Sequence, residues 1–213
     1  IRDRMRIGNV WAACAAILIS LPFSANAENR PRVGLVLEGG GALGFAHIGV
    51  IDWLEQHHIP VDYIAGTSMG GLVGGIYATG RSPAEIRELV NRINWGDVIA
   101  GQTPFQDLSF RRKEDKTAYP NRLEFGLRDG FNLPGGLNAG QQVGLVLDRA
   151  MLPYYSLKSF DDLPIPFRCV ATDLVAGKAK VFDRGSLSSA LRATMSIPGV
   201  FSPVSFNGTM YSD

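Results

Sequence analysis

Cysteine, histidine and long hydrophobic runs are scarce in this sequence. Its 213 residues include two cysteines and three histidines. Cys14 lies in an N-terminal apolar segment and Cys169 in a predicted buried strand, so a mature chain without that segment could form no internal disulfide. No group of His, Cys, Asp and Glu has the spacing of metal ligands. The sequence therefore predicts neither a disulfide scaffold nor a metal site, and it indicates no cofactor.

An excess of charge of one sign is also missing. The 21 basic and 20 acidic residues give a formal net charge of +1, and the aromatic residues are not interleaved with basic ones. Both features argue against a nucleic-acid partner. With 46% hydrophobic and 19% charged residues, the composition is that of an ordinary globular protein with a buried core. The length suits one domain, or one domain and a leader.

The N-terminal residues have the layout of a secretory signal peptide. Three arginines within the first six residues precede the apolar run Val10–Leu21, and Ala25-Asn26-Ala27 provides a cleavage site. The apolar run is shorter than the roughly 20 residues that a membrane-spanning helix needs. An uncleaved N-terminal anchor is the alternative. We expect residues 1–27 to be removed and the chain to be exported, to the periplasm, the outer membrane, the cell surface or the medium.

After this leader, predicted strands and helices alternate. Short apolar runs predict strands at Val33–Leu37 and Val61–Ala65, and apolar periodicity predicts helices at Ala42–His57 and Met69–Thr79. A capping box at Ser82–Glu85 opens a third helix. The alternation predicts right-handed βαβ units, a parallel sheet and an α/β fold.

Shorter sequence patterns predict the strands, helices and turns of the rest of the chain. Strands are expected at 123–127, 131–133, 167–172, 178–182, 204–206 and 209–211, and helices at 141–152 and 186–195. Residues 94–121 have few periodic apolar side chains and contain the mixed charge run Arg111–Lys116. That run favours a solvated surface over the alternative of a lid or substrate loop. Asn207-Gly208 predicts a tight hairpin turn.

A G-x-S-x-G pattern follows the second predicted strand at Gly66-Thr67-Ser68-Met69-Gly70. A serine at such a place stands on a sharp strand-to-helix turn, with its hydroxyl above the sheet. Glycine fits two residues before and after the serine because the turn brings the flanking backbone segments together. A glycine-rich turn whose serine only caps the helix is the alternative. The strand–turn–helix context favours Ser68 as a nucleophile.

A second glycine loop, Gly39–Gly44, follows the first predicted strand and also fits the dinucleotide pattern G-x-G-x-x-G. That pattern needs an acid at the end of the second strand, whereas Asp62 stands at its start. A phosphate cradle without catalysis is a third interpretation. Acyl transfer fits better, because neighbouring parallel strands end at the same edge of a sheet. The amides near Gly40 and Gly41 would then lie close to Ser68 and could stabilise an oxyanion.

The base that would activate the serine is not expected to be a histidine. All three histidines, His47, His57 and His58, precede Ser68. Because α/β-hydrolases place their histidine after the serine, a triad of that order is excluded for these residues. The base is expected among the carboxylates that follow Ser68.

These features together resemble the patatin-like phospholipases. The resemblance rests on the glycine loop, the serine motif and the segment Ala193–Pro203, and it covers residues 32–213. It implies a three-layer α/β/α fold with a mainly parallel central sheet and a Ser-Asp dyad without histidine. By this match Ser68 is the nucleophile and Asp213 the base, with Asp173 as the second choice of carboxylate. The implied oxyanion hole is the loop backbone, and the implied elbow glycines flank the serine: Gly39, Gly40, Gly41, Ala42 and Gly44 for the hole, Gly66 and Gly70 for the elbow.

The resemblance also implies an activity and a partner. The implied activity is that of a lipid acyl hydrolase of phospholipase A or lysophospholipase type. The implied partner is its substrate, a phospholipid or other acyl-ester lipid, met at a membrane surface. The competing interpretation is a catalytically inactive passenger domain that binds lipid. Kinetics of a Ser68→Ala variant would separate the two.

The leader and the stretch Phe110–Lys113 resemble a secreted bacterial subgroup, in which the patatin-like passenger precedes an outer-membrane β-barrel. By this resemblance residues 1–27 are a signal peptide and residues 28–213 a patatin-like domain truncated at its C-terminus. We expect residues 28–213 alone to be poorly folded and inactive. Cooperative unfolding of that fragment together with esterase turnover would contradict this expectation.

Overall fold

The computed structural model describes residues 30–101, 109–111, 113–114, 136–206 and 208–213. The predicted signal peptide and the hairpin predicted at 123–133 lie outside these residues. Val33–Asp213 form one compact unit. Within the described part, no helix is both long and apolar enough to cross a membrane.

The centre of the unit is a mixed sheet with the strand order β1-β2-β4-β8-β7, and β5 pairs with β4. The first three strands run parallel, with Leu37 of β1 opposite Gly66 of β2, and Thr67 of β2 opposite Val170 of β4. The other strands are antiparallel to their neighbours. The strands span Gly34–Leu37 (β1), Tyr63–Thr67 (β2), Phe167–Asp173 (β4), Lys178–Phe182 (β5), Val204–Phe206 (β7) and Thr209–Ser212 (β8). The predicted α/β class with a parallel core is confirmed.

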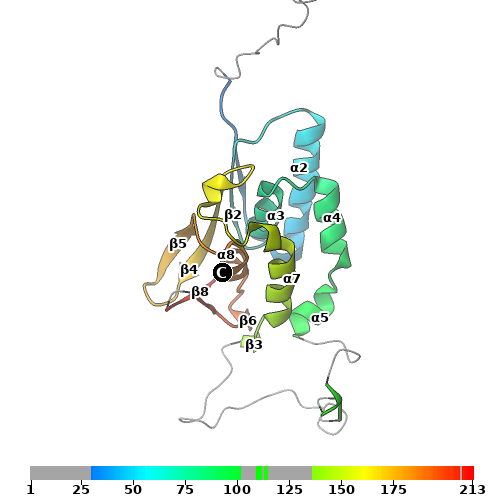
Figure 1. Ribbon diagram of the computed structural model, residues 1–213, viewed down its shortest axis with the longest axis vertical. Coiled ribbons are helices and arrows are strands. Elements are labelled where there is room, and N and C mark those ends of the chain that lie inside the picture. The colour runs from blue at the N-terminus through cyan, green and yellow to red at the C-terminus, as the bar shows by residue number, and fades with distance from the viewer. Residues whose placement is uncertain (1–29, 102–108, 112, 115–135, 207) are drawn as a thin grey trace, which may run out of the picture. The chain divides into compact units, whose positions relative to one another are not determined.

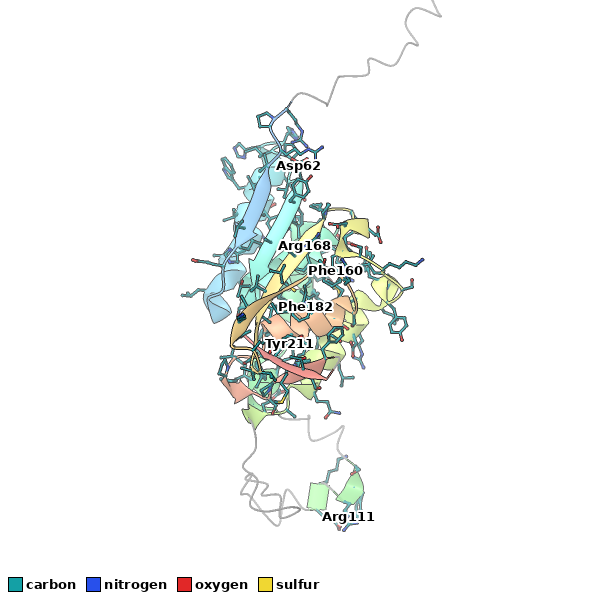
Figure 2. The ribbon with its side chains drawn as sticks, turned by 90° about the vertical axis from the view of Figure 1, so that its left-hand side faces the viewer. Asp62, Arg111, Phe160, Arg168, Phe182 and Tyr211 are labelled. Atoms are coloured by element: carbon teal, nitrogen blue, oxygen red, sulfur yellow. The ribbon has the colours of Figure 1, made fainter. Side chains whose placement is uncertain are left out.

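Helices cover one face of this sheet (Figure 1). They span Ala46–Gln56 (α2), Ser68–Ala78 (α3), Pro83–Arg92 (α4), Trp95–Ala100 (α5), Gln141–Met151 (α7) and Leu187–Thr194 (α8), with short 3-10 turns at Gly41–Phe45 (η2), Leu152–Tyr154 (η4) and Phe160–Asp162 (η5). On the other face of the sheet, Val36 is 79% and Tyr63 43% exposed. Figure 2 shows β1, β2 and β4 side by side, and the aromatic pair Phe182 and Tyr211, whose rings meet edge to face.

Helix α3 is the central helix of the unit, since all of its residues are buried. Its glycines allow two close approaches. A Cβ at Gly74 would lie 2.8 Å from Ile64 of β2, and one at Gly75 would lie 2.6 Å from Leu191 of α8. The small-residue sequence of this helix is therefore what brings it against both the sheet and α8.

Several local predictions are confirmed and others were incomplete. Ser82 caps α4 in the predicted capping box, and β7 and β8 form the predicted hairpin. The helix predicted at Ala42–His57 begins as the 3-10 turn η2 and becomes α-helical at Ala46. Helix α5 was not predicted from the sequence, and neither was a short parallel pair of strands, Gly136–Asn138 (β3) and Gly199–Phe201 (β6). These short elements depend on tertiary contacts rather than on their own periodicity.

Candidate active site

Ser68 lies on a sharp turn between β2 and α3. Its φ is +54°, a value that non-glycine residues rarely adopt. The flanking glycines are required by packing. A Cβ at Gly66 would lie 2.5 Å from the carbonyl oxygen of Gly70, and one at Gly70 would lie 2.3 Å from that of Leu37. The G-x-S-x-G spacing thus produces the strand–turn–helix geometry that places a serine hydroxyl at the carboxyl edge of the sheet.

Asp213 lies directly against this serine. Ser68 Oγ donates a hydrogen bond of 2.5 Å to Asp213 Oδ2, across 145 positions of sequence. Asp213 follows β8, beside α8 (Figure 1), and its backbone N–H donates to the carbonyl oxygen of Ser196 at 2.9 Å. Burial raises the pKa of the Asp213 carboxyl, and the hydrogen bond from Ser68 partly offsets that shift. A carboxylate with a raised pKa holds a proton more readily, which suits a base.

The glycine loop after β1 lies beside Ser68. A Cβ at Gly39 would lie 3.0 Å from the Cβ of Ser68 and 3.7 Å from its Oγ. Gly40 and Gly41 have φ values of +151° and +54°, which favour glycine at both positions. Gly40 also accepts a hydrogen bond from the N–H of Leu43, which closes the loop into η2.

The remaining loop residues hold the loop against α3. A Cβ at Gly44 would lie 2.6 Å from the side chain of Met69, so the loop and α3 are in close contact there. Ala42 lies within η2. The imidazole Nε2 of His47 is 2.9 Å from the carbonyl oxygen of Glu38, at the entry of the loop. The loop proposed from the sequence and Ser68 are thus brought together.

The other candidates have structural roles. Asp173 Oδ1 accepts from the N–H groups of Val175 and Ala176 and so stabilises the turn between β4 and β5. Asp62, the acid considered for a dinucleotide ribose, accepts from the N–H of Val33 at the start of β2, the opposite end of the strand from Ser68. His57 stacks on Trp53 with ring centroids 3.9 Å apart.

Among the described residues, no three His, Cys, Asp or Glu side chains lie close enough to hold a metal ion. Cys169 is fully buried in β4, and burial raises the pKa of its thiol to about 12. This cysteine is part of the core.

Sequence reasoning did not identify the polar residues that surround the serine–aspartate pair. Thr194 Oγ1 accepts from the backbone N–H of Ser68 at 2.8 Å, and it is fully buried. The buried guanidinium of Arg192 donates to the hydroxyl of Ser196 at 2.6 Å. Arg192 and Thr194 both lie in the last turn of α8. Thr194 falls within the segment Ala193–Pro203, whose family resemblance was its only signal in the sequence, and Arg192 had none.

A parallel core with a serine on a tight turn at its carboxyl edge is the architecture of an α/β protein with a nucleophile-elbow site. The sequence profile of the patatin-like phospholipases matches residues 35–213. The chain belongs to the patatin-like phospholipase family.

Two relatives that are similar to this chain carry names consistent with this family. An uncharacterized NTE family protein of Mycobacterium tuberculosis is 34% identical over 186 residues, which are 87% of this chain and 43% of that protein. Lysophospholipase NTE1 of Candida albicans is 29% identical over 185 residues, which are 87% of this chain and 11% of that protein. The chain thus spans less than half the length of either relative.

The fold is shared with a solved structure. The crystal structure of VipD from Legionella pneumophila superposes with a TM-score of 0.52 over 86% of this chain and 46% of that chain, at 15% sequence identity. At this identity the likeness concerns the fold alone.

Proposed function

We propose that this protein hydrolyses acyl esters of lipids, with Ser68 as nucleophile, Asp213 as general base and the glycine loop as oxyanion hole. The observation that carries the proposal is the 2.5 Å hydrogen bond from Ser68 Oγ to Asp213 Oδ2 at a strained elbow. Residues in rare backbone conformations cluster at active sites, where the surrounding structure holds them in place. The family membership supports the same chemistry.

The proposed reaction has two steps. Asp213 takes the proton of Ser68 Oγ while that oxygen bonds to the ester carbonyl carbon, and the negative charge moves to the carbonyl oxygen. Backbone N–H groups of residues 39–44 would stabilise this oxyanion. The alcohol leaves with the proton held by Asp213, and an acyl-serine remains. Water then attacks the acyl-serine, Asp213 takes a proton from the water, and Ser68 recovers its proton as the fatty acid leaves.

We propose that the acyl chain is accommodated beside α3. Leu72 and Ile76 lie one and two turns along α3 from Ser68, and together with Met195 they line an apolar cavity between α3 and α7. The cavity has a volume of about 20 Å³, room for about one water molecule. An acyl chain would therefore enter by displacing flexible side chains such as Met195.

We propose a phospholipid or lysophospholipid as the substrate, met at a membrane surface. A relative that carries the name lysophospholipase supports the substrate class. Apolar side chains are exposed in the loops that follow β1 and β4: Leu43 in the glycine loop is 84% exposed and Val175 is 79% exposed. Exposed apolar groups at the entrance of a lipid-hydrolysing site suit contact with a bilayer.

The test uses the full-length gene product without residues 1–27. Hydrolysis of a short-chain p-nitrophenyl ester and of phosphatidylcholine vesicles is measured for the wild type and for Ser68→Ala, Asp213→Asn and Asp173→Asn. We expect the first two substitutions to abolish turnover, at least about 10³-fold in kcat. Asp173→Asn is the matched control and keeps wild-type kcat, since Asp173 only caps a turn. A folded wild type that binds vesicles without turnover would identify a silent lipid-binding domain instead.

We also propose that residues 1–27 direct export, as in the secreted bacterial members that the leader resembles. The test is expression of the full-length gene in a Gram-negative host, followed by cell fractionation and N-terminal sequencing. Export predicts a mature N-terminus at Glu28. Recovery from the cytoplasm with an intact leader would contradict the proposal.

A further inference from the structure

Both members of the proposed dyad are bound by one short segment, Arg192–Ser196, at the end of α8. Ser68 and Asp213 lie 145 positions apart in the sequence, so tertiary contacts must set the distance between them. Thr194 binds the backbone of Ser68, and Ser196 binds the backbone of Asp213. The two contacts are only two positions apart in the sequence.

Thr194 fixes the conformation of the serine. Its Oγ1 accepts the N–H of Ser68 at 2.8 Å and donates to the carbonyl oxygen of Val170 at 2.5 Å, so the hydroxyl is held from both sides. The N–H of Ser68 is the first of helix α3 and has no partner within the helix. A Cβ at Gly71 would lie 2.9 Å from the methyl group of Thr194, which shows how closely the threonine packs on the helix.

Ser196 fixes the aspartate. Its carbonyl oxygen accepts from the N–H of Asp213 at 2.9 Å and from the hydroxyl of Ser212 at 2.5 Å. Its own hydroxyl donates to the carbonyl oxygen of Arg192 at 2.8 Å. The same hydroxyl accepts from Nη1 of Arg192 at 2.6 Å. Both the main chain and the side chain of Ser196 are therefore held in place by hydrogen bonds.

Arg192 anchors this segment to the rest of the fold. The guanidinium donates to the carbonyl oxygens of Ala139 and Gly140 at 3.3 Å, and it lies over the ring of Phe201 with 5.1 Å to the ring centroid. Gly140 has a φ of +70°, which favours glycine, and the guanidinium occupies the space that a Cβ there would fill. Among the described residues, the hydrogen-bond partners of the Arg192 guanidinium are neutral oxygen atoms, which indicates a structural anchor rather than an ion pair.

We propose that Thr194 and Ser196 are positioning residues, which together set the distance and orientation between Ser68 Oγ and Asp213. This inference rests on the proposed function, because it assigns these residues to the same reaction. The reason is geometric. A misplacement of about 1 Å in a reacting group can lower the rate by about 10²-fold, while the binding of substrate is little affected.

The test compares Thr194→Val with Thr194→Ser in the full-length protein. Valine keeps the shape and removes the hydroxyl, whereas serine keeps it. We expect Thr194→Val to lower kcat on the p-nitrophenyl ester by about 10²-fold with KM within about threefold of the wild type. Thr194→Ser should retain kcat within about threefold.

The control for lost stability is Thr79→Val. Thr79 is also buried, and its hydroxyl also donates to a backbone carbonyl, that of Ile76, at the far end of α3. We expect Thr79→Val to lower the unfolding midpoint without lowering kcat. If Thr194→Val does not fold, Ser196→Ala replaces it. Alanine keeps the carbonyl oxygen that accepts from Asp213 but removes the two hydroxyl contacts with Arg192 that fix its position, so a tenfold or larger fall in kcat at unchanged KM is expected.

The outcomes separate this inference from the proposed function. A wild type without Ser68-dependent turnover would refute the proposed function and with it this inference. An active wild type whose Thr194→Val or Ser196→Ala variant keeps full kcat would refute the positioning role alone. The same would follow if Thr79→Val lost as much kcat as Thr194→Val, since the effect would then be one of stability.

Discussion

Replacing Gly70 with alanine tests whether the close approach of α3 to β1 sets the geometry of the site. A Cβ at residue 70 would lie 2.3 Å from the carbonyl oxygen of Leu37 and 2.4 Å from that of Glu38. Both are backbone atoms, so no side chain can rotate away. Ordinary contact starts at 3.4 Å, and the end of β1 must therefore move from α3 by about 1 Å. The glycine loop follows directly and would move with it.

Two effects are expected from that displacement. Overpacking of this kind costs about 1–3 kcal/mol of stability. Because 1 kcal/mol corresponds to about 2–4 °C for a chain of this length, the unfolding midpoint should fall by about 2–12 °C. The backbone N–H groups of residues 39–44, which are proposed to stabilise the oxyanion, would move away from Ser68, and this should lower kcat by about 10²–10³-fold. The assays are thermal unfolding followed by circular dichroism, and steady-state hydrolysis of a p-nitrophenyl ester well below the midpoint.

Gly144→Ala is the matched control. Gly144 also lies in a helix, α7, but a Cβ there would meet nothing within 4 Å. Alanine is a better helix former than glycine by about 0.5–1 kcal/mol, so this variant should be slightly more stable and fully active. A Gly70→Ala protein with wild-type kcat and midpoint would refute the packing argument, because the elbow would then tolerate a side chain where the structure leaves no space.

Three further predictions concern protonation. Burial raises the pKa of Asp213, so kcat/KM should increase with pH through an apparent pKa above the ordinary aspartate value of about 3.9, and a limb at or below that value would contradict the assignment of the base. The same shift means that Asp213 favours the folded state when protonated and that this contribution is lost as pH rises through the raised pKa. Asp213→Asn should therefore gain thermal stability relative to the wild type between pH 3 and pH 7. The Cys169 thiol, with a pKa of about 12, should react with a thiol reagent only after unfolding, and rapid labelling of the folded protein would show that β4 is not buried as described.

The strand–turn–helix at Ser68 could be predicted because its determinants are local. Gly66 and Gly70 stand at the two positions where the turn brings backbone segments together, and that spacing is visible in five residues. The adjacency of β1 and β2 followed from the tendency of strands that are consecutive in the sequence to be neighbours in a sheet. These two local rules were enough to place the glycine loop beside the serine.

The contacts made by Thr194 and Ser196 could not be predicted in the same way. Thr194 lies 126 positions from Ser68, and its hydroxyl reaches that residue only because α8 packs against α3 and β4. No periodicity in the sequence distinguishes a threonine that binds a distant backbone N–H from one that caps a helix. Asp213 was reached through the family resemblance, since several carboxylates follow Ser68 and spacing alone did not choose among them.

The strained conformation of Ser68 explains why so many fixed contacts surround it. A non-glycine residue at a φ of +54° costs about 1–3 kcal/mol and persists only where its surroundings leave no alternative. Here the elbow glycines allow α3 to press on β1, Thr194 holds the N–H of the serine, and Asp213 holds its hydroxyl. Each contact removes a different way for the turn to relax. The hydroxyl is thereby kept beside a carboxylate whose proton affinity is raised by burial. Under the proposed mechanism, the proton of Ser68 would pass directly to Asp213, with no histidine between them.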